Sequence, residues 1–534
     1  MPKTPIFSML RRAVRTATLE RAGKGLGIGT GLAAGKGLEE QRELGMIPRR
    51  GFLKAGALAG AGLIVPSWIT GCGRPSDVPE SRKAKVVVVG AGVGGLHAAW
   101  LLKKQGINAE VYEAAQRTGG RMLTARNLIA PNSWTEMGGE FIDSTHTDML
   151  ALVKEFKLEL LDFASDEATR FNDVYWFEGR RYTEADVVRE IGPLLDALDR
   201  DLQSMPSSYK NLAESPAQAF DQMSIDAYFT TLGISGWLRS FLEVAFVTEN
   251  GLELGEQSAL NFLTVVSSDV SDGMFHQYGT SDERYKIHGG NEQICGHLTA
   301  GVFNHIHMGH RLEHIGRRGS RYLLSFRKDA TSVDVEADVL LLALPWTILR
   351  EVKIDIDLPP LRRKMINELR YGQNGKTIVG FERPFWQDTS DSGFAYSDMQ
   401  MQVAWDNTGM QGVSAGGMTF FSGGSMNRLT GGMTKDETVN MVLKNVSNIW
   451  PLVSSTKKLR TERIHWPHQP FVKASYSSYG PGQWTDFYGR ECLPEGNLFF
   501  AGEHCSNDHR GYMNGAAETG RFAAEKIAAL LAKK

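Results

Sequence analysis

The most restrictive feature of this sequence is a glycine-rich turn between a β-branched run and an apolar helical pattern. The run covers residues 85–89, the turn residues 90–95, and the helical pattern residues 96–102. The glycines of the turn are Gly90, Gly92, Gly94 and Gly95. In this GxGxxG spacing the first glycine permits a tight turn, the second lets a pyrophosphate approach the backbone, and the last allows the helix to pack closely on the strand. The segment therefore predicts a dinucleotide-binding strand, turn and helix.

A second strand is predicted at residues 109–112, and it ends at Glu113. An acidic side chain at this distance after the turn can accept hydrogen bonds from both hydroxyls of a ribose. An exposed glutamate at a strand end is the alternative, but the preceding turn favours the ribose contact.

Composition excludes several classes of function. Lys plus Arg (59) nearly balances Asp plus Glu (61), and the formal net charge of −2 gives no long-range field that would attract nucleic acid. The four cysteines form no CxxC pair and have no histidine at ligand spacing, so we expect neither a disulfide scaffold nor a metal site. A chain of 534 residues predicts two or three lobes.

Later segments resemble the flavin amine oxidases, a family that includes monoamine, polyamine and L-amino-acid oxidases. The matching segments are Gly-Gly-Arg at 119–121, Glu-Met-Gly-Gly-Glu at 136–140, and the C-terminal stretches 498–504 and 511–516. The likeness extends from about residue 85 to the end of the chain. It implies FAD as the cofactor, and it implies further cofactor contacts from Gly120, Arg121, Gly138, Gly139, Leu312, Gly502, Glu503 and Met513.

The same resemblance implies the catalytic residues. Residues 375–378, followed by Pro-Phe-Trp at 384–386, look like the strand that carries the active-site lysine of the family, which here is Lys376. Tyr476 and Tyr512 stand where the family has the paired aromatic walls of the substrate site. The residue before Tyr476 is Ser475, where covalent members have a cysteine, so we expect FAD to be bound non-covalently.

Substrate choice is less determined. The snake-venom type of L-amino-acid oxidase carries an arginine for the substrate carboxylate in the segment that matches residues 138–142, and this chain has Glu140 and Phe141 there. Either another arginine binds a carboxylate, or the substrate has none and Glu140 receives a second positive charge. The candidate arginines are Arg126, Arg284 and Arg383.

We expect an FAD-dependent oxidase of amines, L-amino acids first, that yields an imine and hydrogen peroxide from the amine and dioxygen. The alternatives within enzymes are a monoamine or polyamine oxidase, a decarboxylating monooxygenase of the tryptophan 2-monooxygenase kind, and an NAD-linked dehydrogenase. The alternative outside enzymes is a flavin-binding protein without turnover.

The N-terminus resembles a twin-arginine export signal. Residues 49–54 carry the paired arginines, and an apolar stretch over residues 55–69 follows that is too short to cross a bilayer. Cys72 completes a possible lipobox, so a lipid anchor is one alternative. We expect residues 1–45 to form a flexible basic extension, unless translation begins at Met46. We therefore expect an interaction with the twin-arginine translocation machinery and a periplasmic or membrane-anchored extracytoplasmic location.

The predicted fold is a two-lobed α/β flavoprotein in which a Rossmann-like FAD-binding domain is interleaved with a substrate domain of mixed sheet and a helical cap. The FAD domain is expected at residues 83–130, 285–350 and 485–534, the substrate domain at 131–150 and 351–484, and the cap at 151–284, where residues 148–161 have a helical pattern.

Non-covalent binding of FAD has a direct consequence. Acid or heat precipitation of the protein should release the flavin into the supernatant, because no thiol precedes Tyr476 to hold it. The measurement is flavin absorbance in supernatant and pellet, and flavin retained by the pellet would contradict the expectation.

Overall fold

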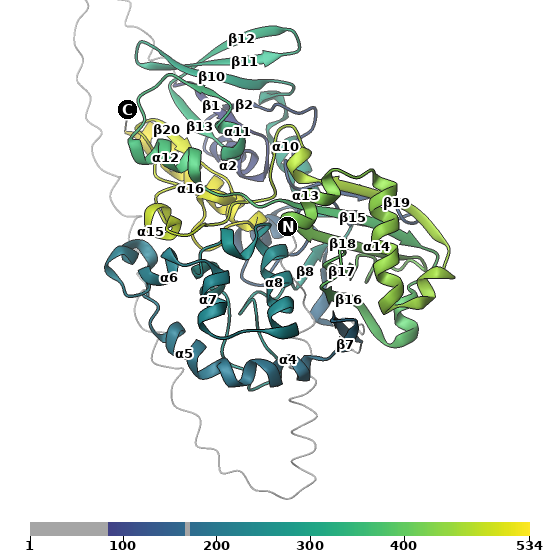
Figure 1. Cartoon of the computed structure of the whole chain (residues 1–534). Coiled ribbons are helices and arrows are strands. Elements are labelled where there is room, and N and C mark those ends of the chain that lie inside the picture. The colour runs from purple at the N-terminus through teal and green to yellow at the C-terminus, as the bar shows by residue number, and fades with distance from the viewer. Residues whose placement is uncertain (1–83, 166–170, 534) are drawn as a thin grey trace, which may run out of the picture. The chain divides into compact units, whose positions relative to one another are not determined.

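The computed structural model of the protein describes residues 84–165 and 171–533 (Figure 1). The predicted export signal, Cys72 and the basic extension lie outside these described residues. Within the described part of the chain, no helix combines the length and the apolar character that a membrane crossing requires.

The glycine-rich turn follows the central strand of a five-stranded parallel sheet. The strand order is β20 (Leu498–Phe500), β13 (Val339–Leu342), β1 (Val86–Val89), β2 (Ala109–Tyr112) and β9 (Ile306–His307). All four side chains of β1 are buried, as expected for a parallel strand that is covered on both faces. The predicted strands at 85–89 and 109–112 are thus confirmed to within one residue.

Different layers cover the two faces of this sheet. Val86 and Val88 belong to the hydrophobic core that also includes α2 (Val93–Lys104), α10 (Gln293–Val302) and α16 (Met513–Ala532). Val87 and Val89 point to the opposite core, which the sheet β12-β11-β10-β14 closes. The bounds of its strands are Thr331–Ala337, Arg321–Lys328, Arg311–Arg318 and Lys353–Ile354, in that order. The alternation of side chains along one strand therefore builds two cores.

A mixed seven-stranded sheet forms the second lobe, with the order β19-β15-β18-β17-β16-β6-β7. The strands are Lys458–His465, Asn374–Phe381, Gly416–Gly423, Val403–Asp406, Asp391–Ser397, Asn172–Phe177 and Arg180–Tyr182. One face packs on α14 (Lys435–Ile449), and the other contacts α8 (Gly236–Asn250). Figure 1 shows this sheet beside α13 (Gly424–Gly431) and α14.

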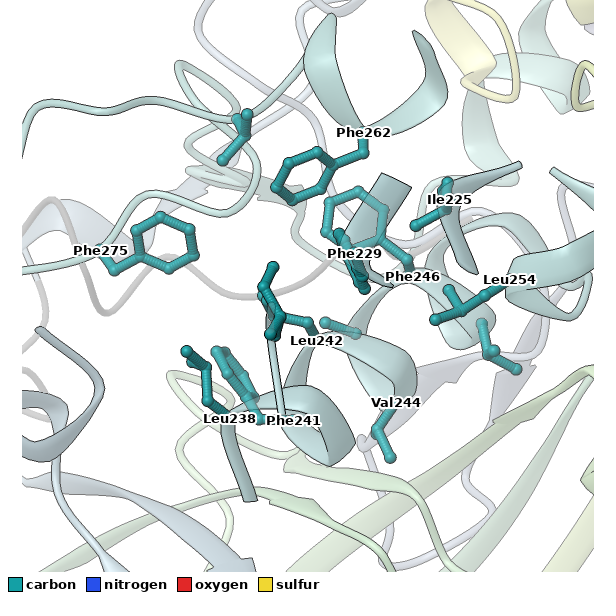
Figure 2. Close-up of a cluster of buried hydrophobic side chains, with 14 of the residues drawn as sticks. Ile225, Phe229, Leu238, Phe241, Leu242, Val244, Phe246, Leu254, Phe262 and Phe275 are labelled. Atoms are coloured by element: carbon teal, nitrogen blue, oxygen red, sulfur yellow. The ribbon is translucent and has the colours of Figure 1, made fainter. Parts of the chain in front are cut away.

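A helical layer lies against α8 and resembles the predicted cap. Its other helices are α4 (Glu184–Ile191), α5 (Leu195–Gln203), α6 (Gln218–Gln222), α7 (Ile225–Thr231) and α9 (Leu260–Leu263). Figure 2 shows its core, in which Phe229, Phe246 and Phe262 gather around α8. The phenylalanine rings meet edge to face, with centroids of Phe246 and Phe262 5.0 Å apart.

The structure differs from the expected cap at two places. Strands β6 and β7, inside residues 151–284, belong to the seven-stranded sheet, where β6 pairs with β16. The helix expected over 148–161 is α3 (Thr147–Glu155), because Lys157 takes a φ of 55° that no helix continues. The chain then enters β5 (Leu160–Asp162), which pairs with β8 (Tyr285–Ile287).

Helices α2 and α16 touch backbone to backbone at two glycines. A Cβ added to Gly520 would lie 2.2 Å from the carbonyl oxygen of Gly94, and one added to Gly94 would lie 2.9 Å from that of Ala516. The close approach brings the N-terminal turn of α2 beside the N-terminal turn of α16.

Replacing Gly520 by Ala should lower the free energy of unfolding by about 1–3 kcal/mol, because the new methyl group must push a backbone carbonyl aside. The measurement is a chemical-denaturation curve. The matched control is Gly296→Ala on α10, where an added Cβ meets no atom within 4 Å. The control should be neutral or stabilising by up to about 1 kcal/mol, and equal destabilisation of both variants would contradict the close contact.

Candidate functional site

A cavity of about 790 Å³ lies at the carboxyl ends of the parallel strands. Its wall includes the residues that directly follow β1, β2 and β13, and it includes Gly502, two residues after β20. This edge of an open parallel sheet is where such folds bind dinucleotides. The predicted residues that line it are Gly90, Gly92, Gly94, Glu113, Gly120, Arg121, Gly139, Leu312, Gly502, Glu503, Tyr512 and Met513.

The glycine-rich turn leaves room for a phosphate and donors to bind it. A Cβ added to Gly92 would meet no atom within 4 Å, so this glycine borders open space. Helix α2 begins there without a capping side chain and without an acidic residue in its first turn, which leaves its N–H groups to an anion. Gly95 lies behind the wall, where a Cβ would lie 2.0 Å from the oxygen of Gly90. Its packing role agrees with the prediction.

Glu113 is fixed at the cavity wall by the turn itself. Its carboxylate accepts hydrogen bonds from the backbone N–H of Ala91 at 2.7 Å and of Ala115 at 2.8 Å. Burial raises the pKa of this carboxyl above its ordinary value. The ribose contact stays a prediction. Glu113 lines the cavity, as that contact would require.

Arg121 and Glu503, predicted as separate cofactor contacts, form an ion pair of 2.9 Å at the cavity. Arg121 also donates to the carbonyl oxygen of Ser475 at 2.7 Å, and Glu503 accepts from Ser477 and from the N–H of Gly511. Burial alone would raise the pKa of Glu503, but the charge of Arg121 and the hydrogen bonds outweigh it and bring the pKa to about 2. The pair therefore stays charged and joins distant segments of the chain.

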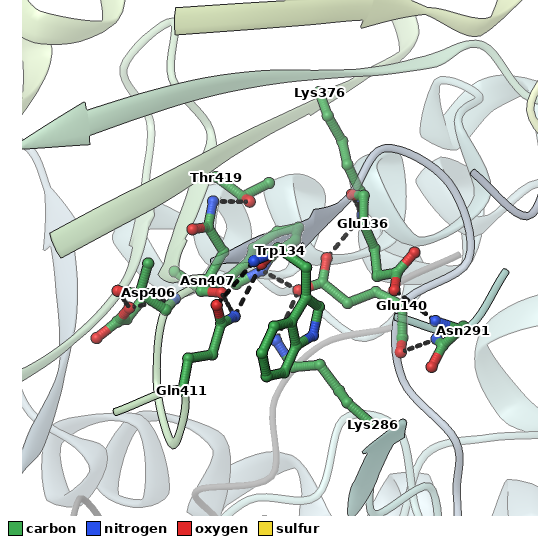
Figure 3. Close-up of polar contacts among 12 residues, drawn as sticks. Trp134, Glu136, Glu140, Lys286, Asn291, Lys376, Asp406, Asn407, Gln411 and Thr419 are labelled. Carbon is green, nitrogen blue, oxygen red and sulfur yellow. Dashed lines mark hydrogen bonds and ion pairs between the residues drawn. The ribbon is translucent and has the colours of Figure 1, made fainter. Parts of the chain in front are cut away.

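Lys376 lies in β15 and is buried in a polar cluster (Figure 3). Its Nζ donates to the carbonyl oxygens of Glu136 and Gly138, each at 2.9 Å, and to Oε2 of Glu140 at 2.7 Å. The other oxygen of Glu140 accepts from Lys286 at 2.9 Å and from the indole N–H of Trp405 at 3.1 Å. All three ammonium donors of Lys376 are thus used inside the protein.

This cluster lies behind the cavity wall and holds it in place. Gly139 lines the cavity, whereas Lys376, Glu140 and Gly138 do not. A Cβ at Gly138 would lie 1.8 Å from the carbonyl oxygen of Arg121, so this glycine serves close packing of the two segments. Lys376 therefore anchors the segment that forms part of the wall.

The cluster also determines the charges of its carboxyl groups. Burial alone would raise the pKa of Glu140, but Lys286 and Lys376 outweigh it and lower the pKa to about 2. Burial raises the pKa of Glu136 to about 7 and lowers the pKa of Lys376. Glu140 is neutralised by two ammonium groups, which corrects the expectation that it receives a substrate cation. Phe141 packs against Lys286, whose Nζ lies 4.8 Å from the ring centroid.

Tyr476 and Tyr512 share an acidic environment. The hydroxyl of Tyr476, which is fully buried, donates to the carbonyl oxygen of Glu249 at the end of α8. Tyr512 precedes α16 and lines the cavity. Burial raises the pKa of both phenols well above the ordinary value, and the charges of Glu249 and Glu283 raise it further. The structure therefore places both tyrosines near the same two carboxylates.

The three arginines considered for a substrate carboxylate are all paired with acids and lie outside the cavity wall. The pairs are Arg126 with Glu292 at 3.3 Å, Arg284 with Asp162 at 2.7 Å, and Arg383 with Asp388 at 2.6 Å.

Ser475 and Cys505 also take defined places. The Ser475 hydroxyl donates to the side-chain oxygen of Asn374. Cys505 is buried in the core beneath β20 and does not line the cavity. No cysteine of the described residues is part of the wall, which suits the expected non-covalent cofactor.

Sequence reasoning missed three side chains of the site. Lys286 and Trp405 complete the cluster around Glu140, and Trp466 lines the cavity while its indole N–H donates to the carbonyl oxygen of Met137 at 3.2 Å. The only available signal was the buried neighbour Ile287, which places Lys286 within a short strand.

Comparisons with known proteins agree with this geometry. The family described as flavin containing amine oxidoreductase matches residues 93–528. Amine oxidase [flavin-containing] B of Bos taurus is 25% identical over 459 residues, which cover 84% of this chain and 86% of that protein. The protein of the same name from Homo sapiens is 26% identical over 462 residues, with the same two shares.

Solved structures share the fold. Cyclohexylamine oxidase from Brevibacterium oxydans IH-35A has a TM-score of 0.73 and 23% identity, covering 84% of this chain and 100% of that one. Wild-type putrescine oxidase bound to putrescine has a TM-score of 0.69 and 19% identity, covering 84% and 99%. The family match spans most of the chain, and the cavity offers the glycine turn and anion-binding donors that FAD needs. The chain therefore belongs to the flavin-containing amine oxidoreductases, whose cofactor is FAD.

Proposed function

We propose that the protein oxidises amines that lack an α-carboxylate and passes the electrons to dioxygen, which becomes hydrogen peroxide. The observation that carries this proposal is the charge around the two tyrosines. The charged groups that act most on the two tyrosines are carboxylates: Glu249 acts first on both, followed by Glu283 on Tyr476 and by Asp143 on Tyr512. A negative environment attracts an amine and repels a substrate carboxylate.

The arginines support the same choice. An L-amino acid needs a guanidinium that is free to form a bidentate pair with its carboxylate. Arg126, Arg284 and Arg383 are each engaged by an acid of the protein. These arginines therefore favour carboxylate-free amines, the monoamine or polyamine alternative, over L-amino acids as substrates. A decarboxylating monooxygenase would need the same carboxylate contact and is disfavoured for the same reason.

The protein groups have defined tasks in this reaction. Bound FAD supplies the acceptor for two electrons from the carbon next to the amine and returns them to dioxygen. Lys376 holds residues 136–140 against the cavity through its two backbone hydrogen bonds. Arg121 and Glu503 fix the segments around Ser475 and Gly511. Tyr512 gives the amine an aromatic surface at the cavity, and Tyr476, which does not line the cavity, is held behind it by the carbonyl oxygen of Glu249.

A panel of amines tests the proposed function. We expect peroxide release with primary monoamines and diamines and at least tenfold lower kcat/KM with the corresponding L-amino acids, because the added carboxylate meets Glu249 and Glu283. Peroxide should equal the oxygen consumed. A preference for L-amino acids would refute the proposal. A flavin that no amine bleaches without oxygen would support the alternative of a binding protein.

Lys376→Met should slow oxidation at least tenfold while FAD remains bound, because the segment at 136–140 loses both of its anchoring backbone bonds. The matched control is Lys286→Met, which removes the other ammonium group from Glu140 and leaves those backbone bonds intact. The measurements are kcat, KM and flavin content of each variant. If Lys376→Met is as active as the wild type, Lys376 has no part in the reaction.

A further inference from the structure

One buried carboxylate near the tyrosines accepts no hydrogen bond from any of the residues that the structure describes. Glu283 directly precedes Arg284 and β8, its side chain is 1% exposed, and neither of its oxygens has a hydrogen-bond partner among the described residues. Burial of an ionised carboxylate without a donor is strongly unfavourable. A group of this kind needs either a proton or a ligand that brings donors.

The backbone holds this side chain in an unusual conformation. Glu283 has a φ of 41°, in the left-handed region that residues other than glycine rarely adopt. Its N–H donates to Oδ1 of Asp143 at 3.0 Å, and Oδ2 of Asp143 accepts from Ser281 at 2.8 Å. Asp143 thus has donors of its own while it fixes the backbone of Glu283. Backbone strain that the surrounding contacts maintain is common where side chains meet ligands.

The charges around Glu283 point to a cation. The carboxylates that act on it are those of Asp143, Glu249 and Glu140, and together with burial they raise its pKa well above the ordinary value. Glu140 is already neutralised by Lys376 and Lys286. Among the described residues no group of His, Cys, Asp and Glu has the arrangement of a metal site, so the charge is not arranged for a metal ion.

The position of Glu283 relates it to the substrate. Asp143, which accepts the N–H of Glu283, donates its own N–H to Nδ1 of His146 at 3.0 Å. The ring centroid of His146 lies 4.8 Å from that of Tyr512, which lines the cavity. The carboxylate of Glu283 also acts electrostatically on both Tyr476 and Tyr512. Glu249, which also acts on both phenols, has its backbone carbonyl bound to the Tyr476 hydroxyl. The unpartnered carboxylate therefore lies by the tyrosine pair and not on a remote surface.

We propose that Glu283, with Glu249 beside it, forms a subsite for a second ammonium group of the substrate, so that the enzyme prefers diamines to monoamines of equal chain length. This inference rests on the proposed amine oxidation. The distal ammonium brings the N–H donors that the oxygens of Glu283 lack, and its charge offsets the negative charge of the neighbouring acids. One end of the diamine is oxidised, and the other stays protonated and bound.

The test compares 1,4-diaminobutane with 1-aminobutane, which differ only in the second amine. The wild type should favour the diamine in kcat/KM by about 10- to 100-fold, the range expected for one charge-assisted hydrogen-bonded contact. Glu283→Gln should remove most of that ratio, and Glu283→Asp should retain more of it than Gln does. The control is Glu243→Gln on α8, an exposed carboxyl that should keep the wild-type ratio.

Binding to the FAD-loaded protein without oxygen gives a second readout. Calorimetry should show tighter binding of the diamine to the wild type and loss of that difference in Glu283→Gln. If the ratio of kcat/KM for the diamine to kcat/KM for the monoamine is the same in the wild type and in Glu283→Gln, the subsite is refuted. If the variant does not fold, equal binding of the two amines to the wild type refutes it. Failure to oxidise either amine would refute the proposed function, while the binding comparison would still decide the subsite.

Discussion

A single carboxylate between two ammonium groups, all three buried, sets the geometry on which the site depends. Glu140 binds Lys376 of β15 and Lys286 of β8, so it joins the seven-stranded sheet to the strand that follows the helical layer. Removing these charges from water is costly. Their mutual attraction offsets that cost only when the remaining donors and acceptors of the charged groups also form hydrogen bonds. Lys376 meets this condition with two carbonyls, and those carbonyls belong to the segment that carries Gly139 into the cavity wall.

Carboxyl groups near the cavity differ in ionisation because their partners differ. Glu140 and Glu503 have cationic partners, and the pKa of each falls to about 2 despite burial. Glu136 has only neutral hydrogen-bond donors, and burial raises its pKa to about 7. Glu283 has no donor to its oxygens among the described residues, and burial raises its pKa well above the ordinary value. The first two thus stabilise the framework, while the last is suited to an incoming cation.

Local patterns in the sequence predicted much of the cofactor half. The strand, turn and helix at 85–102 depend on neighbouring residues, and they appear in the structure as expected. The pairing of Lys286 with Glu140 joins strands far apart in the chain, and nothing in either segment encodes it. Glu283 lies in a run of polar residues at 280–284, a pattern that is typical of an exposed loop. The strands β6 and β7 were predictable, because Glu178 and Gly179 form a two-residue hairpin turn directly after the aromatic and β-branched run at 174–177.

The contact of α2 with α16 has a consequence for biosynthesis. The glycine turn is synthesised before the seven-stranded sheet, but Tyr512 and Met513, which form another part of the same wall, are synthesised after it. Domains generally fold as units during synthesis, N-terminal parts first. Here the nucleotide-binding half stays incomplete until α16 docks at Gly94. A closed cofactor chamber therefore cannot form before α16 has been synthesised, and a chain that stops short of α16 lacks that part of the wall.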